Sequence, residues 1–142
     1  MFFSIHDLAR DAVDILDNLD VRQAHFVGLS LGGMTGQSCA IHHGERLASL
    51  SLLATTSFLP PASAWEDRAK QVRAEGMTPL LEGILQRWFT SDFRSASPHH
   101  IKTIASDFIK VHAGAYALCC EAIAHMDLRH DLPRIKIPTL II

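Results

Sequence analysis

The sequence predicts an α/β fold in which a partial parallel sheet, of about three strands, is interrupted by an all-helical insert. A short apolar run at 24–27 is typical of a strand and leads through a glycine-rich turn into a helical pattern. A second apolar run at 48–54 follows that helix, and a strand–helix–strand unit of this length forms a right-handed parallel crossover. Strand signals then stop after Thr55 and return only at 135–142.

These observations divide the chain into an incomplete sheet core, residues 1–57 and 131–142, and a helical lid, residues 58–130. A length of 142 residues is enough for one domain with a real core. Ligands in open α/β sheets bind at the carboxyl ends of the strands, so the lid is expected to close over that edge.

The first helix is predicted from its start signal. Ser4 with Asp7 is typical of a capping box and opens a helix that runs to about Leu19. The helix after the glycine-rich turn is expected to end near His43, with Gly44 as its C-terminal cap.

The lid is predicted from its helix starts. A stiff linker, 58–61, precedes them, and the three starts are Ser63 with Glu66, Thr78-Pro79 and Ser97-Pro98. A further helix is expected over about 113–126. Pro133 ends the lid, and the third strand follows over 135–142 with Pro138 near its start.

Composition argues against several classes of partner. The net charge is −2 and no basic cluster is dense enough to follow a phosphate backbone, so no nucleic-acid partner is expected. No stretch approaches the roughly 20 apolar residues of a membrane span. The N-terminal residues lack the basic region and long apolar run of a signal peptide.

The cysteines point to a cytoplasmic protein with reduced thiols. There are three, Cys39, Cys119 and Cys120, and an odd count with two adjacent does not resemble a disulfide framework. No metal-ligand spacing surrounds them, so no metal is expected.

The segment Gly28-Leu29-Ser30-Leu31-Gly32 carries the strongest functional signal. A serine between a strand and a helix, in a G-x-S-x-G pattern, is typical of a nucleophile elbow. Glycine two residues to either side is expected to remove the Cβ atoms that would collide in so sharp a turn. The helix start directs its free N–H groups at the serine, and the N–H of Leu31 is the expected oxyanion donor.

Two nucleotide-binding motifs also contain closely spaced glycines, and both fit this segment less well. A phosphate-binding loop would need Lys and Ser/Thr where Met34 and Thr35 stand. Ser30 occupies the second glycine of a dinucleotide-binding fingerprint. A G-x-S-x-G match alone arises by chance in many chains, so its strand–turn–helix setting is what makes it informative.

The chain also resembles a known family, the 3-oxoadipate enol-lactonases of the α/β-hydrolase fold. The resemblance covers essentially the whole chain, and its lid segments are more specific than the elbow, which many hydrolases share. The matching segments are 25–34 around the elbow, Arg87-Trp88-Phe89-Thr90, 114–123, Met126-Asp127-Leu128-Arg129 and 131–135.

This resemblance implies a substrate, 3-oxoadipate enol-lactone, an intermediate of bacterial aromatic-acid breakdown by the β-ketoadipate pathway. Ser30 would attack the ring carbonyl, expel an enolate and form an acyl-enzyme that water hydrolyses to 3-oxoadipate. No cofactor and no metal is needed for this reaction.

The resemblance also implies that the catalytic triad is incomplete here. In this fold the order is serine, then an acid, then histidine, and the acid and histidine are expected beyond Ile142. The loop with the second oxyanion donor is expected before Met1. The chain is therefore interpreted as the central part of a longer enzyme, inactive by itself. Each of its nine histidines fits a surface or capping role better than a catalytic one.

Substrate contacts are expected in the lid. Trp65 and Trp88 could wall an apolar pocket around the lactone ring, although packing between lid helices is slightly favoured for each. The substrate carboxylate requires a cationic partner, and Arg87 is the candidate. Spacing alone does not favour it over Arg68, Arg73 or Arg94, and a solvated helix face explains each.

The sequence leaves other functions open. The nearest is hydrolysis of another small carboxylic ester by the same fold, and a different class is a non-catalytic ligand-binding member. A split or fused enzyme completed by another chain is a third. The sequence does not determine the oligomeric state, but an open apolar sheet edge predicts that the chain made alone is poorly soluble or oligomerises.

Overall fold

The computed structural model describes residues 3–142 and confirms the α/β class. Three parallel strands form one sheet in the order β1 (Ala24–Leu29), β2 (Leu47–Leu53) and β3 (Thr139–Ile141). Seven α-helices are present in the described residues: α1 (Ile5–Asn18), α2 (Leu31–His42), α3 (Ala62–Glu75), α4 (Leu81–Trp88), α5 (Ser91–Ala96), α6 (Pro98–Ile109) and α7 (Ala113–Ala124). Helices α3 to α7 all lie between β2 and β3 in the sequence.

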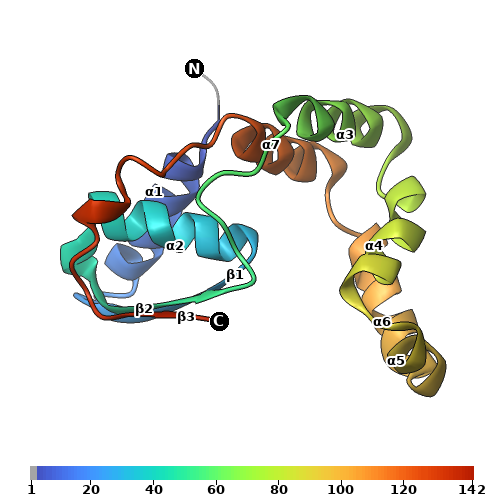
Figure 1. The fold of residues 1–142 in the computed structure, drawn as a ribbon, viewed down its shortest axis with the longest axis horizontal. Coiled ribbons are helices and arrows are strands. Elements are labelled where there is room, and N and C mark those ends of the chain that lie inside the picture. Colours follow the sequence, from blue (N-terminus) through green and yellow to red (C-terminus); the bar gives the residue numbers. More distant parts are fainter. Residues whose placement is uncertain (1–2) are drawn as a thin grey trace.

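Helices α1 and α2 cover one face of the sheet (Figure 1). The core between them joins Ala9 and Val13 of α1, Cys39 and Ala40 of α2, and Leu47, Leu50 and Leu52 of β2. Burying each leucine contributes about 1.5–3 kcal/mol. A Cβ at Gly36 would lie 2.9 Å from Leu50 and Phe26 side-chain atoms, so this glycine lets α2 approach the sheet closely.

The opposite face of the sheet is bare in the described residues. Alternate residues of β1 point to it, and Val27 and Leu29 are 70% and 65% exposed. Strand β1 is also an edge of this sheet, since β2 is its one partner strand within residues 3–142. The open apolar edge expected from the sequence is therefore present.

The lid has two packed parts. Helices α3 and α7 pack side by side through Ala69, Ala117 and Cys120 (Figure 1). A second cluster of Val72, Met77, Ile84 and Phe108 joins α3 to α4 and α6. Figure 1 shows α4, α5 and α6 at the opposite end of the long axis from α1, on the side toward which the strands run.

The capping box at the start of α1 is confirmed. The Ser4 hydroxyl accepts a hydrogen bond from the Asp7 backbone N–H, and the Asp7 carboxylate accepts one from the Ser4 N–H at 2.9 Å. These two bonds satisfy donors that a helix start leaves free, which is why the local signal is reliable.

Helix α2 ends at His42, close to the expected position, but several expected caps and helix starts are wrong. Helix α2 ends with His43 as its C-cap, and Gly44 instead opens a short 3₁₀ turn without a positive φ. Helix α3 starts after Pro61, so Ser63 lies inside the first turn and does not cap it. Thr78 begins a 3₁₀ turn, and α4 starts three residues later.

Two further differences concern short elements. Helix α5, of six residues, is not expected from the sequence; its N-cap Thr90 accepts a hydrogen bond from Phe93 N–H. The third strand is confined to three residues because only Thr139, Leu140 and Ile141 pair with β2.

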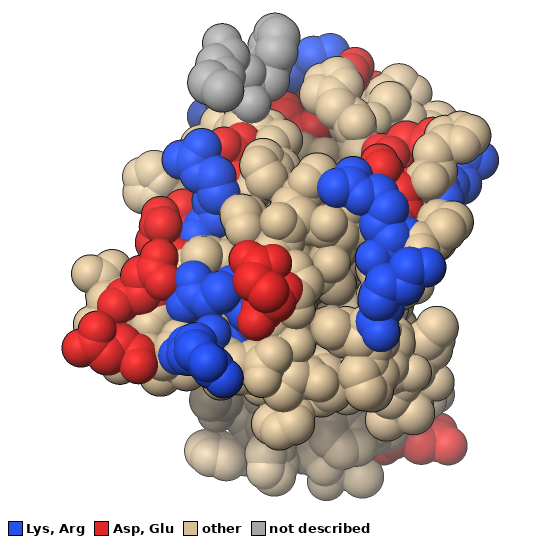
Figure 2. All heavy atoms as spheres, turned by 90° about the vertical axis from the view of Figure 1, so that its left-hand side faces the viewer, with Lys and Arg blue, Asp and Glu red and all other residues tan. Residues whose placement is uncertain are grey.

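Acidic and basic side chains are interspersed on the face shown in Figure 2. The best-formed ion pair of the core joins Arg46 to Asp17 at 2.7 Å, and the same guanidinium donates to the carbonyls of Val21 and Arg22. None of the helices in residues 3–142 has the length and hydrophobicity needed to cross a membrane.

Candidate active site

Ser30 lies in a strained turn between β1 and α2. Its φ of 50° and ψ of −114° fall outside the regions that L-residues favour. Its N–H donates to the Leu53 carbonyl at 3.0 Å, so the β1–β2 pairing continues up to this residue. The strand, sharp turn and helix expected from the sequence are all present, and the Ser30 side chain is exposed and does not cap α2.

Only one of the two predicted glycine contacts is present. A Cβ at Gly28 would lie 2.3 Å from the Gly32 carbonyl oxygen, so Gly28 is required by the turn. A Cβ at Gly32 would meet nothing within 4 Å, and the expectation of a collision there is wrong. The second crowded position is Gly33, where a Cβ would lie 2.6 Å from the Thr55 Cβ.

The N-terminus of α2 faces the space beside Ser30. Leu31 is the first residue of this twelve-residue helix, so its N–H has no partner within the helix. The N–H groups of Gly33 and Met34 turn back to the Ser30 carbonyl at 2.9 and 3.1 Å. The helix dipole adds to the attraction of this end for negative charge. The Leu31 N–H is therefore the first donor of α2 after Ser30, and its role as oxyanion donor stays a prediction.

A threonine outside the G-x-S-x-G pattern, which sequence reasoning misses, contacts the elbow directly. Thr55 follows β2, and its hydroxyl donates a hydrogen bond of 2.6 Å to the Ser30 carbonyl. The sequence offers one signal for Thr55, namely that it closely follows β2, and β2 is the neighbour of the strand that leads to Ser30.

Most of the histidines are engaged away from Ser30. His25 Nδ1 lies 2.7 Å from the Ser49 hydroxyl on the sheet. His6, His42 and His43 form a ring cluster at the far end of α2. Because an α-helix rises 1.5 Å per residue, His42 lies about 16 Å along the axis from Leu31. Burial lowers the pKa of His42, and nearby His6 lowers it further.

The remaining histidines belong to the lid and its exit. His112 caps α7 by accepting the Ala115 N–H at 3.2 Å, and His99 packs edge-on against its neighbour His100. His125 is the C-cap of α7, and His130 is exposed. The assignment of all nine to surface or capping roles stays a prediction.

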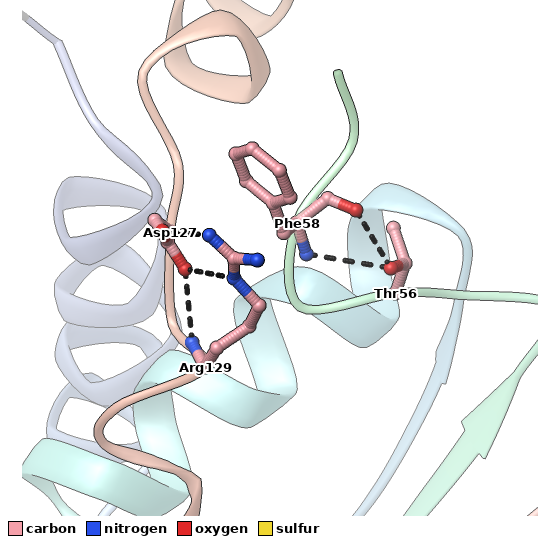
Figure 3. Close-up of polar contacts among 4 residues, drawn as sticks. All are labelled: Thr56, Phe58, Asp127 and Arg129. Atoms are coloured by element: carbon pink, nitrogen blue, oxygen red, sulfur yellow. Dashed lines mark hydrogen bonds and ion pairs between the residues drawn. The ribbon is translucent and has the colours of Figure 1, made fainter.

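The two segments that connect the lid to the core are fastened to each other (Figure 3). Phe58 and Asp127 form an antiparallel bridge, and Leu128 N–H donates to the Ser57 carbonyl at 2.9 Å. Arg129 binds both carboxylate oxygens of Asp127, at 2.9 and 2.7 Å, and its guanidinium lies over the Phe58 ring. We call these contacts of Phe58, Asp127 and Arg129 the lid clamp.

The lid clamp also explains the role of Asp127. The hydrogen bonds from Arg129 lower the pKa of this carboxyl to about 2, so it is ionised and paired. Both of its carboxylate oxygens accept hydrogen bonds from Arg129, so Asp127 is engaged in the clamp and not with a histidine. On the entering segment, the Gln37 amide of α2 donates to the Thr56 carbonyl at 3.1 Å, which ties the clamp to the elbow helix.

The structure separates the proposed substrate contacts. Trp65 of α3 packs against a cluster that includes Met34 and Leu31, and so lies near the elbow. Trp88 of α4 is 55% exposed and meets Phe108 edge-on, with ring centres 6.0 Å apart. Arg87 directly precedes Trp88 on α4 and is exposed to solvent. Trp65 thus packs on the same cluster as the first turn of α2, whereas Arg87 and Trp88 lie on α4, at the other end of the lid (Figure 1).

The other candidate arginines have partners within the lid. Arg73 pairs with Glu121 of α7 through two hydrogen bonds, and Arg94 lies 3.7 Å from the Glu82 carboxylate. Arg68 lies over the Trp65 ring at 5.0 Å. Arg68 and Arg87 are therefore the two candidates without a carboxylate partner among residues 3–142.

The cysteines are poor alternative nucleophiles. All three are free thiols. Burial raises the pKa of Cys120 to about 11 and raises the pKa values of Cys39 and Cys119 as well. The reactive thiolate is therefore scarce at neutral pH. Within the described residues, no three His, Cys, Asp or Glu side chains are grouped so that they could hold a metal ion.

Comparison with known proteins agrees with this geometry. Residues 2–142 match the family model of the alpha/beta hydrolase fold. The chain is 41% identical over 140 residues to 3-oxoadipate enol-lactonase 2 of Acinetobacter baylyi, and the match covers 99% of this chain and 52% of that protein.

Solved structures give the same result. The enol-lactonase from Burkholderia xenovorans superimposes with a TM-score of 0.94 at 36% identity, covering 98% of this chain and 54% of that one. A thermophilic esterase from Thermogutta terrifontis superimposes with a TM-score of 0.90 at 25% identity, covering 99% and 54%. The chain spans about half the length of the curated relatives it matches.

Proposed function

The chain belongs to the alpha/beta hydrolase fold family, and from that premise we propose that it carries the nucleophile and lid of a serine hydrolase that opens 3-oxoadipate enol-lactone. The observation that carries the proposal is the backbone of Ser30, held at φ 50° between β1 and α2, directly before the N–H of the first helical residue, Leu31. Strained residues of this kind cluster at active sites. The 41% identity to an enol-lactonase over nearly the whole chain supports the substrate class.

The proposed reaction begins at Ser30. The Ser30 hydroxyl attacks the lactone carbonyl while a base removes its proton, and the tetrahedral oxyanion is stabilised by the Leu31 N–H. Collapse breaks the ring C–O bond and expels an enolate, which is a better leaving group than an alkoxide. Protonation of the enolate gives the ketone, and water then hydrolyses the acyl-enzyme to 3-oxoadipate and free Ser30. The chemistry uses no cofactor.

We propose that residues 1–142 do not turn over substrate by themselves. Serine needs a neighbouring base to act as a nucleophile. His25, His42 and His112 contact groups other than Ser30, which supports a base supplied by residues outside this range. Turnover of the lactone by purified residues 1–142, lost in Ser30→Ala, would contradict this proposal.

For substrate binding we propose Trp65 as a wall beside the lactone ring, with Trp88 further out, and Arg87 as the partner of the substrate carboxylate. The packing of Trp65 on the cluster with Leu31 supports its part. The free thiols of Cys39, Cys119 and Cys120 support a cytoplasmic location.

The test is an assay of the full-length gene product on the enol lactone and on simple esters. We expect efficient lactone hydrolysis that Ser30→Ala reduces by at least about a thousandfold, because loss of the nucleophile removes the covalent route. Ser63→Ala, an exposed serine on α3, is the matched control and retains activity. Lactone hydrolysis that survives Ser30→Ala would reject the proposed mechanism.

One second function has a specific observation in its favour. The match to the Thermogutta terrifontis esterase, with a TM-score of 0.90 at 25% identity, supports hydrolysis of a small acyclic ester by the same serine. Higher kcat/KM on simple esters than on the enol lactone would favour it.

A further inference from the structure

The carbonyl oxygen of Ser30 is unusually well supplied with hydrogen-bond donors. It accepts the N–H groups of Gly33 and Met34, which are part of the start of α2, at 2.9 and 3.1 Å. The third donor is the Thr55 hydroxyl, at 2.6 Å. A carbonyl cannot donate, so the direction of this last bond is unambiguous, and it is the shortest of the three.

The backbone brings Thr55 to this position at some cost. Ala54, directly before it, has a φ of 42°, in the left-handed region that non-glycine residues seldom adopt. Ala54 N–H donates to the Ile142 carbonyl at 3.0 Å, which holds this residue at the end of β2. Two positive-φ residues, Ser30 and Ala54, thus sit at the carboxyl ends of neighbouring strands, and such strain is typical of functional sites.

The Thr55 side chain also has little freedom to turn away. It lies so close to α2 that a Cβ built on Gly33 would be 2.6 Å from both its Cβ and its Cγ2 atoms. The glycine therefore provides the space in which the threonine fits. The hydroxyl oxygen lies equally close, 2.7 Å from the same Cβ position, and donates to the Ser30 carbonyl.

The Ser30 carbonyl and the Leu31 N–H belong to one peptide group. This peptide is planar and trans, so the two groups point in opposite directions, the carbonyl into the helix and the N–H out of it. A hydrogen bond accepted by the carbonyl polarises the peptide and makes its N–H a stronger donor. The Thr55 hydroxyl thereby acts on the oxyanion site without touching it.

We propose that Thr55 is a positioning residue that strengthens the Leu31 N–H as oxyanion donor through its hydrogen bond to the Ser30 carbonyl. The inference rests on the proposed function, since it assigns a second partner to the same oxyanion site. It differs from a merely structural role, in which Thr55 would only fix the end of β2 against α2.

A spectroscopic experiment measures the polarisation without substrate. Full-length protein is labelled with ¹³C at serine carbonyls and ¹⁵N at leucine amides, so only Ser–Leu peptides give a correlation. Residues 1–142 contain three such pairs, 30–31, 49–50 and 51–52. The first signal is identified by its loss in Ser30→Ala, and the two in β2 serve as internal references.

In Thr55→Val, which keeps the shape and removes the hydroxyl, we expect the Ser30 ¹³C signal and the Leu31 amide proton to move upfield. In Thr55→Ser both stay close to the native positions. Should Thr55→Val disturb folding, Thr55→Ser and Thr55→Ala still differ by one hydroxyl and give the same comparison. Equal Ser30–Leu31 shifts in the variants with and without the hydroxyl would overturn the proposal.

Kinetics give the second readout. Removing a whole oxyanion donor lowers kcat by about a hundred- to a thousandfold. If the Thr55 bond strengthens the Leu31 donor by about 10–30%, its loss in Thr55→Val lowers kcat by about two- to eightfold and leaves KM unchanged. Thr55→Ser keeps the hydroxyl and should retain the native kcat. If Thr55 acted only by packing, Thr55→Ser, which lacks the methyl group, would lower kcat as much as Thr55→Ala. Thr139→Val is the matched control, because it removes a hydroxyl on β3 that also donates to a carbonyl, that of Ile137.

The two proposals fail in different ways. Turnover that does not depend on Ser30 rejects the proposed function, whatever the Thr55 variants do. Ser30-dependent turnover with kcat unchanged in Thr55→Val rejects only the role of Thr55.

Discussion

The guanidinium carbon of Arg129 lies 3.9 Å from the centre of the Phe58 ring. Phe58 is on the segment that enters the lid and Arg129 is on the segment that leaves it, so this cation–π contact joins the two connections (Figure 3). The same arginine holds Asp127, whose backbone pairs with Phe58. The clamp thus joins the two connections of the lid next to the Thr55–Thr56 segment, and helices α3 and α7 also pack on Ile5 and Met34 of the core.

The lid clamp is expected to open in acid. The pKa of Asp127 is lowered to about 2 from an ordinary value of 3.8, first because of the hydrogen bonds from Arg129. Because the folded state holds this carboxyl ionised more strongly than the unfolded chain does, the carboxyl stabilises the folded state above pH 3.8. This contribution is lost as the pH falls toward 2. Hydrogen–deuterium exchange of residues 55–61 and 126–130, corrected for intrinsic rates, should therefore increase between these pH values.

Asp127→Asn provides the control for the clamp. It keeps the shape but removes the charge, so exchange in these two segments should be fast at neutral pH and should not change further in acid. Asp107→Asn, whose carboxylate pairs with Lys110 on the exposed end of α6, should leave the segments protected at neutral pH. Protection of residues 55–61 that is the same in Asp127→Asn and in the unsubstituted protein would show that the clamp does not hold the lid.

The glycines of the elbow should respond unequally to substitution. Gly28→Ala places a Cβ 2.3 Å from a backbone oxygen that cannot move without distorting α2, and overpacking of this kind costs about 1–3 kcal/mol. Gly32→Ala meets open space inside a helix and should be neutral or stabilise by up to about 1 kcal/mol. Urea unfolding of both variants measures the difference, and a loss of stability in Gly32→Ala equal to that in Gly28→Ala contradicts it.

Arg87 should matter for a charged substrate and not for a neutral one. If its guanidinium binds the substrate carboxylate, Arg87→Gln raises KM and so lowers kcat/KM by about ten- to hundredfold. This is the usual effect of losing a hydrogen bond to a charged group. A lactone lacking the carboxylate should be hydrolysed equally by both proteins. Lys102→Gln removes the same charge from exposed α6 and is the control.

The same assay on Arg68→Gln decides between the two arginines that have no carboxylate partner in residues 3–142. Arg68 lies over the ring of Trp65, and Trp65 packs against the cluster that contains Met34 of α2. A loss specific to the carboxylate substrate in Arg68→Gln, with Arg87→Gln unaffected, would move the anion site to α3.

The elbow and the first helix could be predicted because their signals are local. The capping box is complete within Ser4–Asp7, and the collision at Gly28 involves residues only four positions away. Gly33 could not be identified, because the side chain that crowds it comes from Thr55, which only the β1–β2 pairing brings close.

The remaining errors have the same origin. The apolar residues at 135–142 predict a long third strand, but its length is set by how many of them pair with β2. Helix α5 has six residues, too few for an apolar period to show. The positions proposed for substrate binding are a different case, because nothing in the sequence around them indicates how far they lie from Ser30. That distance depends on how the lid helices pack on the core.

The bare face of the sheet leads to the last prediction. Val27 and Leu29 of β1 are 70% and 65% exposed, and Leu140 of β3 is 56% exposed. Apolar surface of this kind favours association, and so does the edge of β1, which has no partner strand among residues 3–142. Residues 1–142 produced alone should therefore elute as oligomers in size-exclusion chromatography with light scattering. Val27→Lys with Leu29→Lys should shift them toward the monomer because charges on an exposed strand oppose association, whereas Leu118→Lys, at an exposed leucine of α7, should not. A sharp monomer peak with cooperative thermal unfolding of the unsubstituted residues 1–142 would contradict this prediction, because the exposed apolar face would then not drive association.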